Sequence, residues 1–170
     1  MRKLWEDHIT WTRLAIVSFA AGLPDFDTTA ARLLRNQADI GNAVKPYYGA
    51  KAGNRLTALL KDHINGAVAL LQAAKSGDTA AFDKAKADWY ANADQIARFL
   101  SRANPHHWKF KVVDRLMRTH LDTTLTEAAD RLAGKFDADV CDYDAVHRHI
   151  LMMADALSNG IIAQFPGRFR

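Results

Sequence analysis

Apolar residues recur every three to four positions along almost the whole chain, which is the pattern of amphipathic α-helices. Clusters of Gly, Pro, Asn and Asp interrupt the pattern and predict six helices, at 3–21, 27–44, 50–75, 79–102, 107–133 and 137–164. Connections this short require neighbouring helices to be antiparallel. We therefore predict an all-α fold, an antiparallel four-helix bundle with an added N-terminal helical hairpin.

Length and composition agree with a single helical-bundle domain over residues 1–170. Of the 170 residues 49% are apolar, and a domain of this size buries roughly 70% of its unfolded surface without a disulfide or metal to hold it. Only 4 Pro and 9 Gly are present, which excludes a collagen-like or low-complexity chain and disfavours an all-β fold. No internal repeat or linker divides the chain.

Charge and hydropathy limit the binding partners and the cellular location that we expect for the protein. The net charge of +4 comes from interspersed basic and acidic residues, so we expect no nucleic-acid patch. The longest apolar stretch, 14–23, is too short for a membrane span. The first residues lack a signal-peptide core, and the single cysteine, Cys141, fits a reducing compartment. We expect a cytoplasmic protein, with removal of a leader as the alternative; the oligomeric state stays undetermined.

One histidine lies on the apolar stripe of each of four predicted helices. Counting from the turns places His63, His120 and His147 at one level of the bundle, together with Asn92 of the fourth helix. In a straight N-terminal hairpin, His8 would lie about 7 residues, or roughly 10 Å, outside this layer. His8 joins the layer only if the first helix packs against the bundle independently of the second.

This layer predicts a site for a divalent transition metal, Zn²⁺, Fe or Mn²⁺. Several buried imidazoles cost free energy unless each has a partner, and one metal ion partners all of them. Two carboxylates lie at helical spacings from these histidines. Asp144 is three residues before His147, and Glu127 is seven residues after His120. The few oxygen ligands at this level disfavour Mg²⁺ and Ca²⁺. The predicted ligands are His63, His120 and His147, with His8, Asp144 and Glu127 as further candidates.

Two alternatives to the metal site stay open. In the first, the histidines form the hydrogen-bonded core of a non-enzymatic helical ligand-binding or interaction module. In the second, they line a small-molecule or haem pocket, although the chain has no Cys-x-x-Cys-His motif for covalent haem. The Glu-x-x-His pairs of ferritin-like proteins and the nucleophile motifs of hydrolases are also absent. The sequence therefore does not decide whether any reaction is catalysed.

Several short segments together resemble a group of short bacterial all-helical proteins. The matching segments are Leu-Trp-Glu-Asp-His at 4–8, Pro-Tyr-Tyr-Gly at 46–49, Trp-Tyr-Ala-Asn-Ala-Asp at 89–94, Met-Ala-Asp at 153–155 and Gln-Phe-Pro at 164–166. The resemblance covers nearly the whole chain. It implies a bacterial origin and a single domain, and it carries no activity, cofactor or site residue over to this chain.

Overall fold

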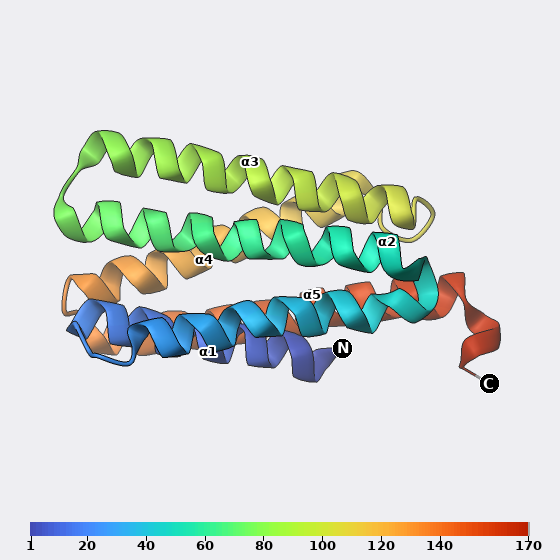
Figure 1. The fold of residues 1–170 in the computed structure, drawn as a ribbon, viewed down its shortest axis with the longest axis horizontal. Helices are drawn as coiled ribbons and strands as arrows, with labels where there is room; N and C mark the ends of the chain where they lie inside the picture. The colour runs from blue at the N-terminus through green and yellow to red at the C-terminus, as the bar shows by residue number, and fades with distance from the viewer. Residues whose placement is uncertain (170) are drawn as a thin grey trace.

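A computed structural model describes residues 1–169, and the predicted all-α class is confirmed (Figure 1). Short turns connect the helices, and the chain closes with a short 3₁₀ helix, η1 (Pro166–Arg168). The helices are α1 (Arg2–Ala21), α2 (Phe26–Ser76), α3 (Thr79–Ala103), α4 (Phe110–Leu132) and α5 (Phe136–Gln164). No helix in the described residues is long and apolar enough to cross a bilayer.

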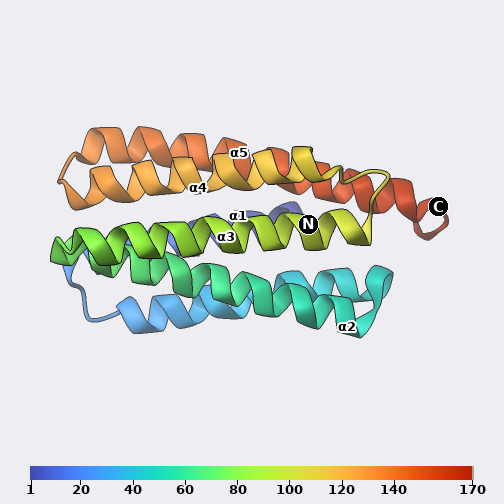
Figure 2. The same ribbon diagram turned by 90° about the horizontal axis from the view of Figure 1, so that it is seen from above.

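Helix α2 consists of two halves that double back on each other at Gly49 (Figures 1 and 2). Gly49 has φ 83° and ψ 165°, a conformation that side chains disfavour, and Pro46 removes a backbone donor just before it. The two halves approach closely where a Cβ on Gly41 would lie 2.6 Å from the carbonyl oxygen of Gly53. The predicted break is therefore confirmed at Gly49, whereas residues 45–48 are helical rather than part of the turn.

Helix α1 packs against three other helices. It contacts α2, α5 and α4, and further contacts join α2 to α3, α3 to α4, and α4 to α5 (Figure 2). Because α1 packs on α4 and α5 as well as on α2, it meets the condition for His8 to join the histidine layer. The largest buried side chains come from all five helices and include Ile9, Leu59, Leu60, Ile96, Leu121 and Ile150.

The turns follow the polar signals of the sequence with one shift. The Asp78 side chain accepts a hydrogen bond from the backbone N–H of Ala81 at 2.9 Å and caps α3. The helix predicted from 107 begins instead at Phe110. Asn104, at the start of the turn between α3 and α4, connects this turn to α5. Its side chain donates a hydrogen bond to the carbonyl oxygen of Gly160 at 2.8 Å. Residues 104–109 are therefore a packed turn rather than helix.

Candidate functional site

Three of the predicted histidines meet in the interior and form what we call the histidine cluster: His8 on α1, His63 on α2 and His120 on α4. Each side chain is only 2% exposed. The ring centroid of His120 lies 5.6 Å from that of His8 and 5.9 Å from that of His63. His120 is therefore the central member, and residues far apart in sequence converge on it.

Two tryptophans enclose the cluster. Trp5 lies edge-on to His8 with ring centroids 5.6 Å apart, and Trp89 stacks on His63 at 5.2 Å. The indole N–H of Trp89 donates to the backbone carbonyl of His63 at 3.0 Å, which fixes the stacked ring. Both tryptophans are buried, so the imidazoles lie in an apolar, water-poor setting.

Asn92 determines which nitrogen of His63 carries the proton. The Asn92 side-chain nitrogen donates to the carbonyl oxygen of Leu59 at 3.1 Å, so its Oδ1 faces His63. Nδ1 of His63 lies 3.2 Å from that oxygen and must donate to it. The Nε2 atom of His63 then keeps a free lone pair, the state in which imidazole binds a metal. The predicted alignment of Asn92 with His63 is confirmed.

The other two histidines have different surroundings. Nδ1 of His8 lies 3.2 Å from Nε2 of Gln37, which also donates to the carbonyl oxygen of Leu33 at 2.9 Å. Nδ1 of His120 is buried and has no hydrogen-bond partner within residues 1–169. A buried polar atom without a partner costs about 1–3 kcal/mol. His120 is therefore the member of the cluster whose Nδ1 has no hydrogen bond to another side chain in the described residues.

Burial keeps all three histidines neutral. It lowers the pKa of His8 to about 3, with repulsion from His63 adding to the effect, and lowers the pKa of His63 to about 4. Burial also lowers the pKa of His120 well below its usual range, and the neighbouring histidines lower it further. Neutral imidazoles hold the lone pairs that metal ions and hydrogen-bond donors need.

The position predicted for His147 is wrong. Its side chain is 35% exposed, and its Nε2 lies 3.2 Å from a carboxylate oxygen of Glu6 on α1. The inward-facing histidine of α5 is His149, which is 6% exposed and whose Nε2 lies 2.8 Å from the carbonyl oxygen of Leu116. The predicted ligand Asp144 is also exposed.

The error lies in the helical register chosen for α5. A stripe that contains His147 also contains Val140, which is 54% exposed. Ile150 of that stripe is buried as predicted, but the residues buried beside it toward the N-terminus of α5 include Val146, and Met153 is buried on the same face. The spacing of four and then three between these residues is itself a regular helical pattern and identifies the correct face. His149 lies beside this face, whereas His147 lies away from it.

Glu127 is buried but lies in an ion-pair network rather than in the histidine cluster. Arg13 of α1 contacts Glu127 of α4 at 3.1 Å and also pairs with Asp139 of α5. Arg131 contacts the same Asp139 carboxylate at 3.3 Å. Burial raises the pKa of Glu127 to about 7 despite the bond from Arg13. Sequence reasoning missed this network, although Arg13 on a largely apolar helix was its signal.

The pKa of Asp139 is shifted in the opposite direction to that of Glu127. Its burial opposes ionisation, but the hydrogen bonds and charges of Arg13 and Arg131 outweigh burial and lower its pKa. Asp139 is therefore the anion that anchors both arginines, and Glu127 is the weaker acceptor. The network connects α1, α4 and α5 near one end of the molecule.

As the side chains stand, no three His, Cys, Asp or Glu residues in the described part of the chain are arranged to hold a metal ion. In the histidine cluster, three potential ligands from three helices lie together, with His120 at the centre. No protein-family model, curated protein or solved structure matches this chain. The resemblance to short bacterial helical proteins stays a prediction.

Proposed function

We propose that the protein binds a transition-metal ion, Zn²⁺, Fe or Mn²⁺, through His8, His63 and His120. The observation that carries this proposal is the unpartnered, buried Nδ1 of His120 between two other neutral imidazoles. Buried imidazoles without partners are costly, and a metal ion supplies one partner to all three. His147, Asp144 and Glu127 are no longer part of the proposed ligand set.

The spacing of the rings supports a small adjustment on binding. Two imidazoles bound to one tetrahedral ion, with metal–nitrogen bonds of about 2.0–2.1 Å, have ring centroids roughly 5 Å apart. The observed separations of 5.6 and 5.9 Å are slightly larger. Metal binding would therefore draw His8 and His63 slightly closer to His120.

The surroundings of His63 match those of a metal ligand. Metal-bound histidines usually donate their second N–H to an oxygen, which fixes the ring and raises its basicity. Asn92 supplies that oxygen at 3.2 Å and is itself fixed by Leu59. Three histidine ligands leave a fourth coordination position for water or a substrate. The proposal assigns binding and no reaction.

A second candidate function is supported by Gln37. Its Nε2 donates to the Leu33 carbonyl and faces Nδ1 of His8. If Nδ1 accepts from this amide, the proton of His8 is on Nε2, which then cannot bind a metal. The cluster would in that case be the hydrogen-bonded core of a non-enzymatic ligand-binding or interaction module.

Zinc titration of metal-free protein, purified without an affinity tag, tests the two candidates. We expect calorimetry to give one Zn²⁺ per chain for the wild type, no binding for His63→Ala, and about tenfold weaker binding for Asn92→Ala. His147→Ala is the matched control and binds as the wild type does. Substoichiometric zinc that His63→Ala does not change would reject the metal site and favour the hydrogen-bonded core.

We also infer how the helices are organised into a bundle and where in the cell the protein is located. The four segments after Gly49 would form an antiparallel four-helix bundle, on which α1 and the first half of α2 pack as a hairpin. The contacts from α2 through α3 and α4 to α5 support the order of these segments, and α1 contacts both α2 and α5. A cytoplasmic location is supported by the lone, exposed thiol of Cys141.

A further inference from the structure

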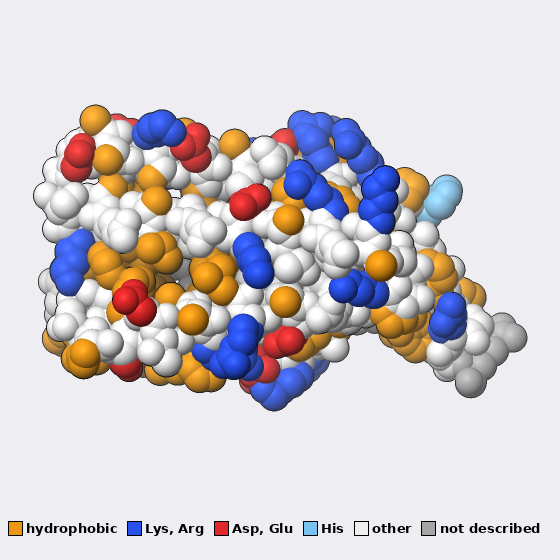
Figure 3. Space-filling model, viewed as in Figure 1, with side chains coloured by type: hydrophobic (Ala, Val, Ile, Leu, Met, Phe, Trp, Pro, Cys, Tyr) orange, Lys and Arg blue, Asp and Glu red, His pale blue; other side chains and the backbone are white. Residues whose placement is uncertain are grey.

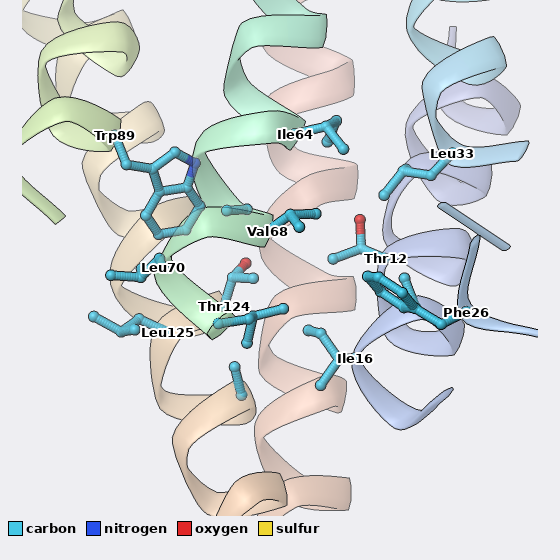
Figure 4. Close-up of a pocket in the computed structure, with 14 residues that line it drawn as sticks. Thr12, Ile16, Phe26, Leu33, Ile64, Val68, Leu70, Trp89, Thr124 and Leu125 are labelled. Carbon is cyan, nitrogen blue, oxygen red and sulfur yellow. The ribbon is translucent and has the colours of Figure 1, made fainter. Parts of the chain in front are cut away.

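The interior beside the histidine cluster offers little room for a ligand. The apolar cleft between α1, the two halves of α2, α3 and α4 has a free volume of about 40 Å³ (Figure 4), which holds no more than about three water molecules. Its walls are mostly hydrocarbon side chains such as Ile16, Leu33 and Val68. A larger partner would therefore have to bind at the surface of the molecule.

Three segments that are far apart in the sequence pack together at one end of the molecule, where α2 turns back at Gly49 (Figure 1). The ring of Tyr48 beside this turn lies 5.6 Å from the ring of Trp108, just before α4, and 5.4 Å from the ring of Phe165, just after α5. These contacts make the end of the molecule one packed unit. We call it the basic end and define it by residues 40–57, 95–113 and 156–169.

The Lys and Arg side chains of the basic end have no acidic neighbours in its three segments. These segments contain eight Lys and Arg and no Asp or Glu. The whole chain has 23 Lys and Arg against 19 Asp and Glu, so the rest of the chain is net negative. The charges are interspersed along the sequence, and the fold separates them along the long axis. On the face shown in Figure 3, Lys and Arg side chains gather toward the basic end, whereas Asp and Glu side chains lie over the middle and the opposite end.

Five cations of the basic end are exposed and form no ion pair within residues 1–169. They are Lys51, Arg55, Arg102, Lys109 and Lys111. Two acidic residues that flank the basic end in the sequence are already engaged, since Asp94 pairs with Arg98 at 2.7 Å and Asp114 pairs with Arg118 at 3.0 Å. The five cations are therefore available to an anionic partner.

An exposed aromatic ring also lies at the basic end. Phe169 is 46% exposed, and its ring stacks on that of Tyr47 with centroids 5.7 Å apart and 10° between the planes. Both rings line a surface groove of about 220 Å³. Two exposed imidazoles, His106 and His107, lie in the turn before α4. Proteins that bind unpaired nucleic-acid strands combine cations for the phosphates with aromatic rings on which the bases stack.

We propose that the basic end binds single-stranded nucleic acid. The five cations would contact phosphates, and a base would stack on Phe169. A duplex fits less well because its bases are already stacked and paired. An anionic membrane fits less well because the three most exposed large apolar side chains, Met152, Phe136 and Val140, lie outside the basic end. The proposal does not use the histidine cluster and goes beyond metal binding.

Binding of a fluorescent oligothymidylate of about 15 nucleotides, measured by anisotropy with a chelator present, tests this proposal. The affinity should fall as KCl is raised, and the slope of log K against log [KCl] should lie between about −2 and −4 for a few phosphate contacts. Lys51→Glu/Arg55→Glu should weaken binding at least about tenfold. Lys84→Glu/Lys86→Glu is the matched control, because it changes the net charge equally at exposed positions near the opposite end of α3. It should weaken binding less than about twofold.

The aromatic ring is tested separately. Phe169→Ala should weaken binding about fivefold by removing the stacking surface, whereas Phe136→Ala, which removes an exposed ring outside the basic end, should bind as the wild type does. Circular dichroism of each variant should show an intact helical fold. Equal weakening by the two charge-reversal pairs, or an unchanged affinity of Phe169→Ala, would overturn the proposal. A duplex of the same length that binds as tightly as the single strand would also overturn it, as would binding to phosphatidylglycerol vesicles without binding to the oligonucleotide.

Discussion

At the scale of single residues, burial sets the protonation of the histidine cluster. His63 has a pKa of about 4 when folded, against about 6.5 for a free histidine. The unfolded chain therefore binds more protons than the folded chain between these values, and stability falls as the pH drops through 6.5 toward 4. One buried imidazole makes the fold acid-sensitive in a range where exposed histidines have little effect.

His63→Gln should remove its share of this acid sensitivity. Between pH 7 and pH 5, in the presence of a chelator, the wild type should lose about 2 kcal/mol more unfolding free energy than the variant. Urea denaturation at each pH measures the difference, with His147→Gln as the exposed control. Wild-type and His63→Gln curves that run parallel over this range would show that His63 is accessible to protons.

Glu127 titrates in the opposite sense. Burial raises its pKa to about 7, so the folded chain binds the extra proton and the associated stability is lost as the pH rises through 7. Glu127→Gln cannot ionise. From pH 6 to pH 8 the wild type should therefore lose about 1 kcal/mol relative to the variant, as measured by urea denaturation. Asp144→Asn is the exposed control, and an unchanged difference between pH 6 and pH 8 would contradict the buried position of Glu127.

At the scale of helices, local patterns predicted where elements begin and end and placed the histidines of α1, α2 and α4 on buried faces, but they did not give the correct face of α5. The turn at Gly49 and the helix start at Asp78 could be predicted because a tight turn and a helix cap need particular residue types. The buried face of α5 was predicted wrongly because it begins at Asp139. This charged residue is buried only because it pairs with Arg13 of another helix. Such long-range pairing leaves no periodic signal in the sequence.

The two halves of α2 depend on two glycines at their contact. A methyl group on Gly41 would collide with Thr57 and with the carbonyl oxygen of Gly53. Alanine normally favours a helix, but here overpacking should outweigh that preference and reduce stability by about 1–3 kcal/mol. Thermal unfolding of Gly41→Ala checks this, with Gly167→Ala, which has open space around it, as the control. A stabilised Gly41→Ala variant would contradict the close approach.

At the scale of the whole molecule, the sequence predicted the all-α class and two of the three clustered histidines in one layer. His63 and His120 were found by counting along idealised hairpins, and that counting works because straight helices rise uniformly. His8 was placed only conditionally, since hairpin geometry does not say how α1 packs on the other helices. The structure supplies that contact, which brings His8 to 5.6 Å from His120.

The central claim is that His8, His63 and His120 act together as a neutral, metal-binding set. Long-range proton–nitrogen NMR of histidine-labelled protein tests it directly, because it reports the protonation and tautomer of each ring. At pH 6 without metal, the three rings should be neutral, with the proton of His63 on Nδ1. One equivalent of Zn²⁺ should then shift the nitrogens of these three rings and leave unchanged His147 and the exposed His106 and His107 of the turn before α4. Zinc shifts confined to those three other histidines, or protonated cluster rings at pH 6, would contradict the account.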